Sequence, residues 1–543
     1  MRDVRVFRDT HREISGVRLL SELGAALGDL GSSSNSIPPP DRVAEALFRA
    51  GELESILTDR GLDGAIEIAG ITDDLADALL APGSPLAAAL ARVTVPLDVP
   101  ARVLAAPPDG FSHHAVHPLD FAVLVGRIAT LAAPVVVVGI RTIGTTLSAV
   151  VAAALRARGT PAPRFTVRPE GRPGDRRVRL GEPAQRWIRA QIARGASFFV
   201  VDDGSEQSGC SLLAAAEALV AAGAPRGRVA LLCARAPDPA LLLAEGAARR
   251  LAAFTLHAAG PSQIVPEEAM IPLGGGAWRK LCYPDPRRYP PVWAQLERRK
   301  LFSIDGYRLF KFEGHGRWGA AVLERARALH EAGFGPPVED ASEGYLVSPW
   351  IADSAPLRAE SLTTELLHRL STYCAFRASA FPSPPQPPSD LESMLRTNAL
   401  VALGRELGPR VELPQDRPVY ADARMMPHEW VAVPGAAPLK MDATDHGDDL
   451  LFPGPIDVAW DLAGAIVEWR MSASARRVFL DGYRRASGDR SEPRLPAYLY
   501  AYTLFRLAFC IAAAATSPPV EAARLAAAEQ RYRAGLDGLA PPW

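Results

Sequence analysis

The most informative string of the 543-residue chain joins a hydrophobic run to two adjacent acids, because Phe198–Val201 is followed directly by Asp202 and Asp203. A loop rich in Gly and Ser follows, and Leu212–Ala222 then has a helix-like pattern. A buried strand would deliver both carboxylates to its carboxyl end, where they can hold the vicinal hydroxyls of a ribose or a hydrated Mg²⁺. Backbone N–H groups of the loop and of the helix start can bind a phosphate. These groups together suit a 5-phosphoribosyl unit, and the alternative is a pair of helix N-caps.

A second loop of small and basic residues lies upstream, at the end of another predicted strand. It contains Arg141, Thr142, Gly144 and Thr145. An arginine among hydroxyl groups and glycines is suited to binding a diphosphate. Between the two loops, the polar and Arg-rich stretch Arg164–Arg179 is typical of a loop or a hairpin.

The order of these two loops resembles the type I phosphoribosyltransferases, over roughly residues 100–260. The resemblance implies that Asp202 and Asp203 are catalytic and hold the ribose of 5-phosphoribosyl-1-pyrophosphate (PRPP), and that Arg164–Arg179 forms a hood that closes over the site. This chain departs from the family pattern at Gly204, where an aliphatic residue is usual. The other PRPP-binding residues that the resemblance implies are Arg141, Thr142, Gly144, Thr145, Ser205, Ser208, Gly209 and Ser211.

A second group of acids stands near the carboxyl ends of two short β-like segments, with Asp422 after the first and Asp442 after the second. Phosphoryl transfer needs one acid near the acceptor hydroxyl and another that holds Mg²⁺ on the nucleotide phosphates. An alternative is a transition-metal site made by Asp442 with His428 and His446.

This part of the chain resembles the aminoglycoside phosphotransferase branch of kinase-like folds, over roughly residues 300–515. Asp457 and Asp461 fit the family's D-x-x-x-D-L-A element, and Gly344–Trp350 fits its hinge. The resemblance implies a catalytic Asp422, nucleotide binding by Lys311 with Glu324 as its partner, and metal binding by Asp442. Pro427 stands where the family has a metal-binding Asn, so His428 is the expected substitute. A degenerate, non-catalytic kinase fold stays open.

Hydrophobic patterning predicts the elements that position these residues. Short apolar runs alternate with helix-like stretches in the first half, which indicates βαβ units. The fold class is therefore α/β, with a mainly parallel sheet flanked by helices in residues 1–265 and an α+β, two-lobed kinase-like domain in residues 300–543. The Gly- and Pro-rich residues 266–299 are predicted to be a linker. The strands predicted from the runs are Pro134–Gly139, Ser197–Val201, Val229–Cys233, Tyr307–Glu313 and Gly344–Trp350.

Composition limits the classes of partner. A net charge of −1 and a hydrophobic fraction of 48% are typical of a globular chain and give no support to nucleic-acid or membrane binding. The five cysteines form no CxxC pair, which argues against a zinc site and favours a reducing compartment. The apolar segments Ala132–Ile140 and Tyr498–Ala515 are predicted to be a buried strand and a buried helix. The N-terminus lacks the apolar region of a signal peptide.

We therefore expect a bacterial, cytoplasmic, bifunctional transferase that acts on small molecules. The first domain would transfer a phosphoribosyl group from PRPP with Mg²⁺, and the second would use ATP to phosphorylate a small molecule. The rival is a regulatory protein that senses nucleotides without turnover. The acceptor and the oligomeric state, including a homo-oligomer, stay open.

Overall fold

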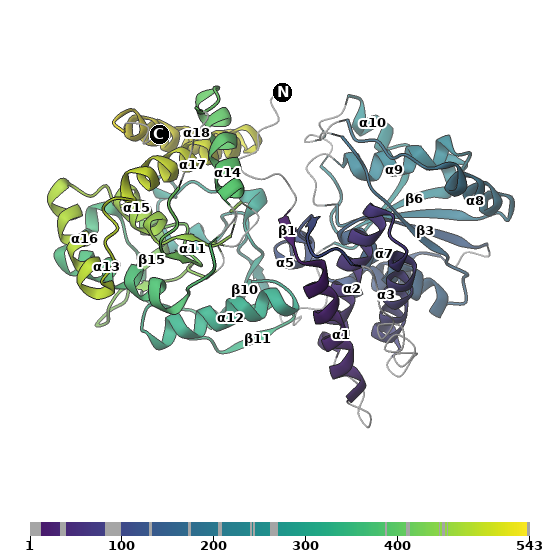
Figure 1. Ribbon diagram of the computed structural model, residues 1–543, viewed down its shortest axis with the longest axis horizontal. Coiled ribbons are helices and arrows are strands. Elements are labelled where there is room, and N and C mark those ends of the chain that lie inside the picture. The colour runs from purple at the N-terminus through teal and green to yellow at the C-terminus, as the bar shows by residue number, and fades with distance from the viewer. Residues whose placement is uncertain are drawn as a thin grey trace. The chain divides into compact units, whose positions relative to one another are not determined.

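The computed structural model describes residues 12–32, 40–81, 99–129, 133–171, 175–204, 209–238, 242, 245–260, 270–385, 388–408, 413–444, 446–447, 451–452 and 454–539. The chain divides into two compact units, which are drawn as ribbons in Figure 1. Thr10–Glu267 with Gly314–Arg317 form the N-terminal unit. Glu268–Glu313 and Trp318–Trp543 form the C-terminal unit.

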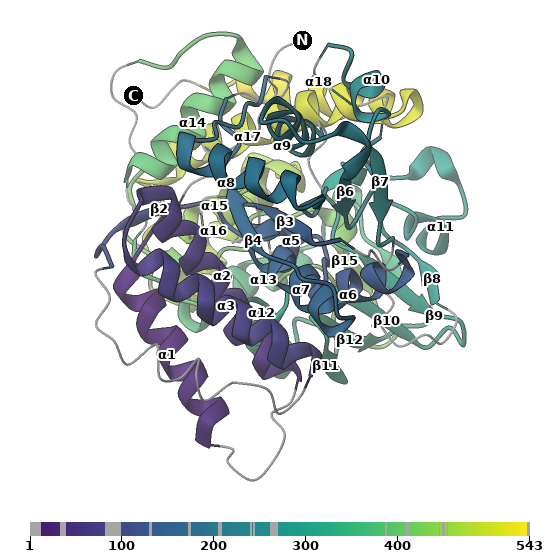
Figure 2. The same ribbon diagram turned by 90° about the vertical axis from the view of Figure 1, so that its right-hand side faces the viewer.

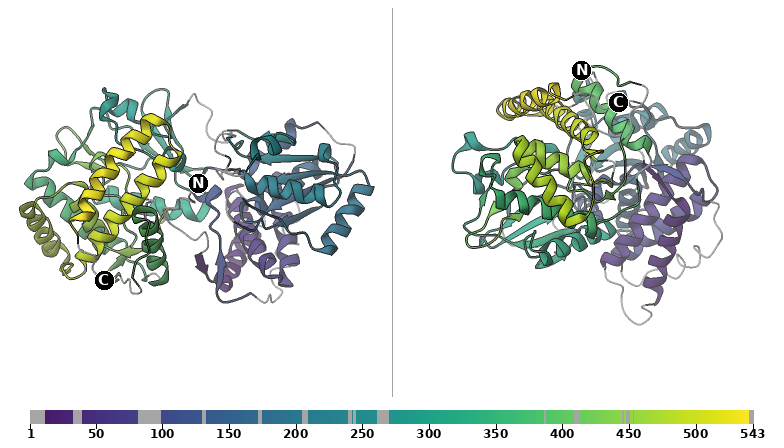
Figure 3. Two further views of the ribbon diagram at one scale, coloured as in Figure 1. Left: turned by 90° about the horizontal axis from the view of Figure 1, so that it is seen from above. Right: turned by 60° about the vertical axis from the view of Figure 1, so that its left-hand side comes forward.

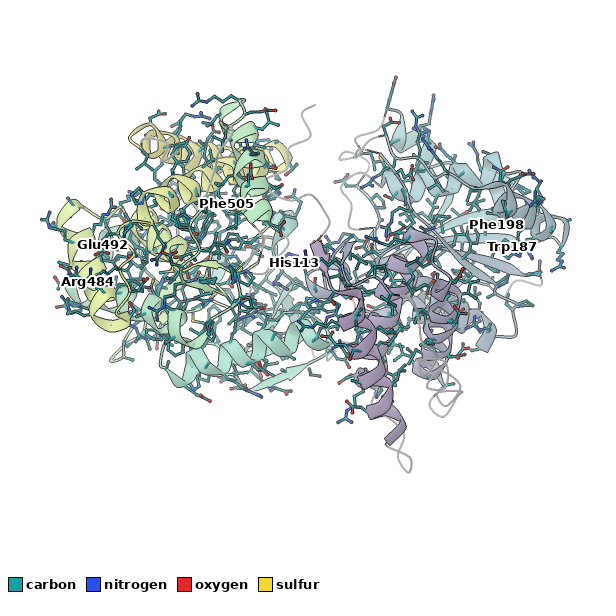
Figure 4. The ribbon with its side chains drawn as sticks, in the orientation of Figure 1. His113, Trp187, Phe198, Arg484, Glu492 and Phe505 are labelled. Carbon is teal, nitrogen blue, oxygen red and sulfur yellow. The ribbon has the colours of Figure 1, made fainter. Side chains whose placement is uncertain are left out.

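The three predicted runs form the centre of a five-stranded sheet in the N-terminal unit, with the order β4-β3-β5-β6-β7. The edge strands β4 and β7 were not predicted, and β4 begins the stretch Arg164–Arg179 that was expected to be a loop or a hairpin. All neighbouring strands are parallel, as expected. The three central strands β3, β5 and β6 are buried on both faces because helices cover them, which explains why their sequences are almost continuously apolar, whereas the edge strands β4 and β7 are only partly buried. Their bounds are β3 Val135–Ile140, β4 Arg164–Val167, β5 Ser197–Val201, β6 Val229–Cys233 and β7 Thr255–Ala258. Figure 4 labels Phe198, a fully buried residue of β5.

The strand order places a switch point in this sheet. From β3 the chain passes through α7 to β4 on one side, and then returns to β5 on the other side of β3. Ligands bind at the carboxyl ends of strands where the order reverses in this way. The ends of β3 and β5, where Arg141 and Asp202 follow, are therefore the favoured place for a ligand.

Helices rich in alanine and leucine pack around the sheet, and α2 and α3 lie side by side against α7 (Figure 2). Gly51 on α2 makes this approach close, because a Cβ there would collide with the hydroxyl of Thr146 on α7. The helices are α1 Gly16–Ser32, α2 Pro40–Arg60, α3 Gly64–Leu80, α5 Asp109–Ser112, α6 Pro118–Arg127, α7 Ile143–Ala157, α8 Glu182–Ala193, α9 Cys210–Ala221 and α10 Ala247–Leu251, with an antiparallel pair β1 Arg12–Ile14 and β2 Val103–Ala105.

The C-terminal unit begins with an antiparallel five-stranded sheet of order β11-β12-β10-β9-β8. The two predicted strands of this region are present as β10 and β12. The alternating pattern of β10 buries Phe310 and Phe312 on one side of the sheet. The bounds are β8 Met270–Pro272, β9 Lys300–Ser303, β10 Arg308–Phe312, α12 Gly316–Glu331, β11 Asp340–Ser342 and β12 Tyr345–Pro349.

The predicted linker 266–299 is wrong for its described part, because residues 270–299 belong to the C-terminal unit. β8 pairs with β9, and the side chain of Trp293 lies in the core of the unit. Arg279, on α11 Arg279–Cys282, forms a buried ion pair with Glu521 at 3.0 Å. The Gly and Pro residues of this segment form turns that pack on the core of the unit, and they do not make it a linker.

Helices and short strands make the rest of this unit, around a core that contains Trp430, Trp460 and Phe505. Figure 4 labels Phe505. The apolar α17 is long enough to cross a membrane by length and composition alone, but 78% of its apolar window is buried in the structure. It runs beside α18 (Figure 3). The elements are β13 Ala355–Pro356, α13 Thr364–Ala380, α14 Pro388–Leu403, β14 Pro418–Val419, β15 Trp430–Ala432, β16 Leu439–Lys440, β17 Ile456–Asp457, α15 Ala459–Glu468, α16 Ala473–Ser487, α17 Leu495–Thr516 and α18 Pro519–Asp537.

Candidate functional site

The antiparallel sheet brings two lysines to Asp442. The Nζ of Lys311 on β10 lies 2.6 Å from Asp442 Oδ1, and the Nζ of Lys300 on β9 lies 3.5 Å from Asp442 Oδ2. The structure therefore joins Lys311 and Asp442, which the sequence singles out separately. Positive charge beside a carboxylate is suited to a nucleotide phosphate and its metal ion.

Glu324 is not the partner of Lys311, contrary to the prediction. It lies exposed on α12, whose buried face carries Val322 and Leu329 instead. The second acid at Lys311 is Glu313, which directly follows β10 and lies 3.0 Å from the Lys311 Nζ. The acid that pairs with Lys311 therefore comes from Glu313, two residues further along the chain, and not from Glu324 on α12 as predicted.

Asp422 lies in a closed polar pocket after β14, and its side chain is fully buried. Lys440 Nζ lies 3.1 Å from Asp422 Oδ2, and the Tyr373 hydroxyl donates to the same oxygen. The backbone N–H of Arg424 donates to Oδ1 at 3.2 Å. Burial alone would lower the pKa of Lys440, but the carboxylates of Asp422 and Glu429 raise it. The pocket therefore holds a charged lysine against Asp422.

Asp461 fixes the backbone of this pocket. Its Oδ2 accepts the N–H of Asp422 and its Oδ1 accepts the N–H of Ala423, both at 2.9 Å. Ala423 has a φ of 63°, a strained conformation for a residue with a side chain, so the loop needs such support. Burial raises the pKa of Asp461 to about 6. Asp457 has a separate role, because its carboxylate binds the Arg417 N–H at 2.7 Å and Arg494 at 3.1 Å.

A set of candidate metal ligands lies around Asp422, but His428 is not one of them. Among the described residues, Asp422, Glu429 and His446 each offer a ligand atom within 4.8 Å of the others. The ring of His428 instead stacks on Trp278, and burial lowers its pKa to about 3. The structure therefore groups His446, and not His428, with the acids.

The carboxylate oxygens of Asp422 and Asp442 suit Mg²⁺, which prefers oxygen ligands and retains several waters, whereas the imidazole of His446 does not. Asp442 is the more open of the two expected acids, with 18% of its side chain exposed, whereas Asp422 is sealed. A metal ion held with a nucleotide would therefore be held by Asp442. The sequence analysis did not single out Glu429 and Lys440, although the position of Lys440 two residues before Asp442 was a usable signal.

In the N-terminal unit, the two expected loops meet at the switch point. Asp202 and Asp203 follow β5 and are both buried. A Cβ on Gly144, in the first turn of α7, would collide with the carbonyl oxygen of Val201, so this glycine allows the loop after β3 to pack against the end of β5. A Cβ on Gly110 would lie 3.1 Å from the Asp203 Oδ2. The first turn of α5 thus borders the acids.

The loop after these acids is described only in part. Ser205 and Ser208 lie outside the described residues. Gly209 has a φ of 52° and precedes α9, and Ser211 is buried in the first turn of that helix. The helix start therefore lies where a phosphate-binding loop is expected to end.

In the predicted diphosphate loop, the side chains of Arg141 and Thr142 contact residues of neighbouring elements. Arg141 Nη1 and Arg168 Nη2 both lie 2.6 Å from the carboxylate of Asp59, on α2. Arg168 Nη1 also lies 3.1 Å from the Thr142 hydroxyl, and Thr142 has a strained φ of 97°. Burial would raise the pKa of Asp59, but hydrogen bonds and charge from the two arginines lower it. Arg168, which lies in the segment expected to form the hood, thus packs beside this loop.

Thr145, which was predicted to bind the diphosphate, instead contacts α2 through its side chain. Its buried hydroxyl lies 2.8 Å from the hydroxyl of Ser55, because α2 packs against the start of α7.

The rings of His113 and His114 contact each other edge to face, and Figure 4 labels His113. His117 caps α6 through its Nδ1, which accepts the N–H of Leu119 at 3.1 Å.

Comparisons with solved structures find kinases over about half of the chain. The choline kinase LicA from Streptococcus pneumoniae matches with 14% identity and a TM-score of 0.32, over 44% of this chain and 89% of that one. A choline/ethanolamine kinase family protein from Mesorhizobium loti matches with 15% identity and a TM-score of 0.30, over 44% and 85%. The macrolide 2'-phosphotransferase MphH from Brachybacterium faecium matches with 16% identity and a TM-score of 0.28, over 49% and 97%.

No family model and no curated protein matches the chain.

Proposed function

We propose that the C-terminal unit is an ATP-dependent phosphotransferase that acts on a hydroxyl group of a small molecule. The observation that carries the proposal is the 2.6 Å contact between Asp442 and Lys311, which lies on the central strand β10. Phosphoryl transfer depends mainly on positioning and on neutralising charge, so a phosphate-binding lysine next to a metal-binding acid is its central requirement. When bound, Mg²⁺ would neutralise the charge that develops on the transferred phosphoryl group.

Each residue then has a distinct task. Lys311 and Lys300 would bind the phosphates of ATP, and Asp442 would hold the metal ion. Asp422 would orient the acceptor hydroxyl and take its proton, while Asp461 keeps the loop of Asp422 in place through its two backbone contacts. The bond between the γ-phosphorus and the bridging oxygen breaks, and a bond to the acceptor oxygen forms.

The second candidate function is nucleotide binding without turnover. It is favoured by the burial of Asp422, which leaves no exposed oxygen for an acceptor, and by the ion pair of this acid with Lys440. Catalysis by Asp422 requires that this pocket opens. The two candidates share Lys311 and Asp442, and they differ only in what Asp422 does.

Calorimetry with MgATP, together with an assay for ADP release in the presence of small alcohols and amino alcohols, tests both. Binding with turnover that Asp422→Asn abolishes supports the phosphotransferase. Binding without turnover supports the nucleotide sensor. An absence of MgATP binding contradicts both.

For the N-terminal unit we propose that the switch point binds PRPP with Mg²⁺ and that the unit transfers its phosphoribosyl group to an acceptor. The proposal is supported by the close packing of Gly144 on the backbone of Val201 and Asp202, which brings the start of α7 to the end of β5, where Asp202 and Asp203 follow. The bond between C1 of the ribose and the diphosphate would break, and C1 would bond to the acceptor. Calorimetry with PRPP and Mg²⁺ tests the binding step.

A further inference from the structure

The side chain of Lys440 fills a cage of oxygen atoms in the C-terminal unit. Its Nζ lies 2.8 Å from Glu429 Oε2, 3.1 Å from Asp422 Oδ2 and 3.2 Å from Asp422 Oδ1, and it also donates to the backbone carbonyl of Asp442. The side chain has no exposed surface. An ammonium group has only three N–H donors, so all of them are directed at this cage.

The cage has the size and the chemistry of a site for a divalent cation. Ligand atoms of Asp422, Glu429 and His446 lie within 4.8 Å of one another. Two oxygens on opposite sides of a divalent ion are about 4–5 Å apart, because its bonds to oxygen are about 2.0–2.6 Å long. One ion could therefore contact all three side chains if the ammonium group were absent.

The acids alone would not identify a cation site, and the decisive observation is the cation already seated among them. Lys440 is fixed by β16, which pairs with β15 through Trp430, directly after Glu429. The strand pairing thus holds the ammonium and one of its acids in register. A surface lysine that happens to meet an acid would retain solvent contact, and this one does not.

We propose that Lys440 is an internal cation that takes the position of a divalent metal ion between Asp422 and Glu429. The ammonium excludes a metal ion from this position by its volume and its charge. It balances one of the two carboxylates, positions Asp422, and leaves Asp442 as the acid that can accept a metal ion. If the proposed phosphotransfer is correct, the reaction then needs one divalent ion where two would otherwise be bound. The proposed position of the Lys440 ammonium, which is called the cation seat below, does not depend on that function.

Binding of Mn²⁺, without any nucleotide, tests the proposal on the full chain after treatment with a chelator. The number of Mn²⁺ ions bound is measured by the loss of the free-ion electron spin resonance signal, and the Tm is followed in parallel. Lys440→Ala is expected to bind one more Mn²⁺ than the wild-type protein. Its Tm without metal should be lower than that of the wild-type protein, because the variant leaves buried carboxylates without the lysine that paired with them. Adding Mn²⁺ should raise the Tm of the variant by several degrees, because the ion binds the folded state.

Two controls separate a cation seat from a merely structural lysine. Adding Glu429→Gln to Lys440→Ala should remove the extra ion, because a cage ligand is lost. Lys280→Ala, at an exposed lysine of α11, should bind the same number of ions as the wild-type protein. If Lys440→Ala is not soluble, Lys440→Asn takes its place, since it also frees the seat and offers an amide oxygen.

A folded Lys440→Ala or Lys440→Asn that binds no additional Mn²⁺ overturns the proposal. So does an extra ion that remains when Glu429 is also replaced. Because no nucleotide enters the measurement, a failure of the proposed phosphotransfer would leave these outcomes unchanged, and the two proposals are tested separately.

Discussion

Lys311 Nζ lies 2.6 Å from Asp442 Oδ1 although 131 residues separate them in the chain. The contact forms because the folding of the C-terminal unit brings Lys311 on β10 beside Asp442, in the segment that follows β16. It places a positive charge on the acid that is expected to hold a metal ion. A nucleotide that enters with Mg²⁺ must exchange this ion pair for new contacts, with the ion at Asp442 and the phosphates at Lys311.

Replacing Asp442 should therefore affect nucleotide binding more than replacing Asp422. We expect Asp442→Ala to weaken MgATP binding at least 10-fold, since a contact to a charged group contributes about 1.5–3 kcal/mol. Asp422→Asn should leave MgATP binding within about 3-fold of wild type, but should abolish turnover. Calorimetry and ADP release measure the two effects. The exposed Asp340 on β11 provides the control Asp340→Ala. Equal loss of binding in both variants would contradict the assigned roles.

Asp461 should matter for stability, because it holds the strained loop of Asp422 and Ala423. Asp461→Ala removes both backbone acceptors and leaves the charge of Arg377, 3.6 Å away, buried without this acid. We expect the free energy of unfolding to fall by about 3–5 kcal/mol. Asp461→Asn, which keeps one acceptor oxygen, should lose less. Urea unfolding measures the change, and Asp481→Ala, at an exposed acid of α16, should stay within about 0.5 kcal/mol of wild type.

His315 gives the N-terminal unit a predictable response to acid. Its buried ring lies 3.1 Å from the carbonyl oxygen of Val116 and packs edge to face with His117. Burial, followed by the charge of His117, lowers its pKa from 6.5 to about 3. The folded state thus binds this proton more weakly than the unfolded state, so the stabilisation is complete above pH 6.5 and is lost as the pH falls towards 3.

The loss should approach about 1.4 kcal/mol for each pH unit below 6.5, or about 2 kcal/mol at pH 5. His315→Gln stays neutral and should lose correspondingly less between pH 7.5 and pH 5. Urea unfolding at the two pH values measures this difference. His330→Gln, at an exposed histidine of α12, should behave as wild type. An identical pH dependence of wild type and His315→Gln would rule out this source of acid sensitivity.

The sequence predicted the strands better than their partners. The runs in β3, β5 and β6 are almost continuously apolar, so burial on both faces could be predicted from them directly. The alternation in β10 likewise predicted that Lys311 lies on a half-buried strand. These are local patterns, and each element forms where its pattern lies. The partners of Lys311 and Thr145 depend on which distant segments pack against them, and no local pattern contains that information.

Two errors show how composition misleads. The Gly- and Pro-rich segment read as a linker forms β8 and part of the C-terminal core, because such residues mark turns and do not show whether a turn packs. The sequence also gives no sign that Lys440 is buried, since lysines are mostly exposed. Its burial results from Asp422 and Glu429 together, which come from separate segments of the chain.

The last prediction concerns Asp202 and Asp203 at the switch point. Both are nearly sealed from solvent, with exposed fractions of 7% and 3%, so a hydroxyl or a metal ion bound there would compete with little water. A hydrogen bond to a charged group contributes about 1.5–3 kcal/mol. Asp202→Asn combined with Asp203→Asn keeps the shape of both side chains and should weaken PRPP binding in the presence of Mg²⁺ by at least 100-fold.

Calorimetry measures this loss, and circular dichroism establishes that the sheet remains folded. Asp175→Asn is the matched control, because 74% of that side chain is exposed on the turn after β4. Arg141→Gln should weaken binding less, since Asp59 already neutralises this arginine. If PRPP binds the double variant as tightly as the wild-type protein, the acids do not hold the ribose. If it binds neither protein, the switch point has another ligand, because the meeting of the two loops through Gly144 and Val201 would still stand.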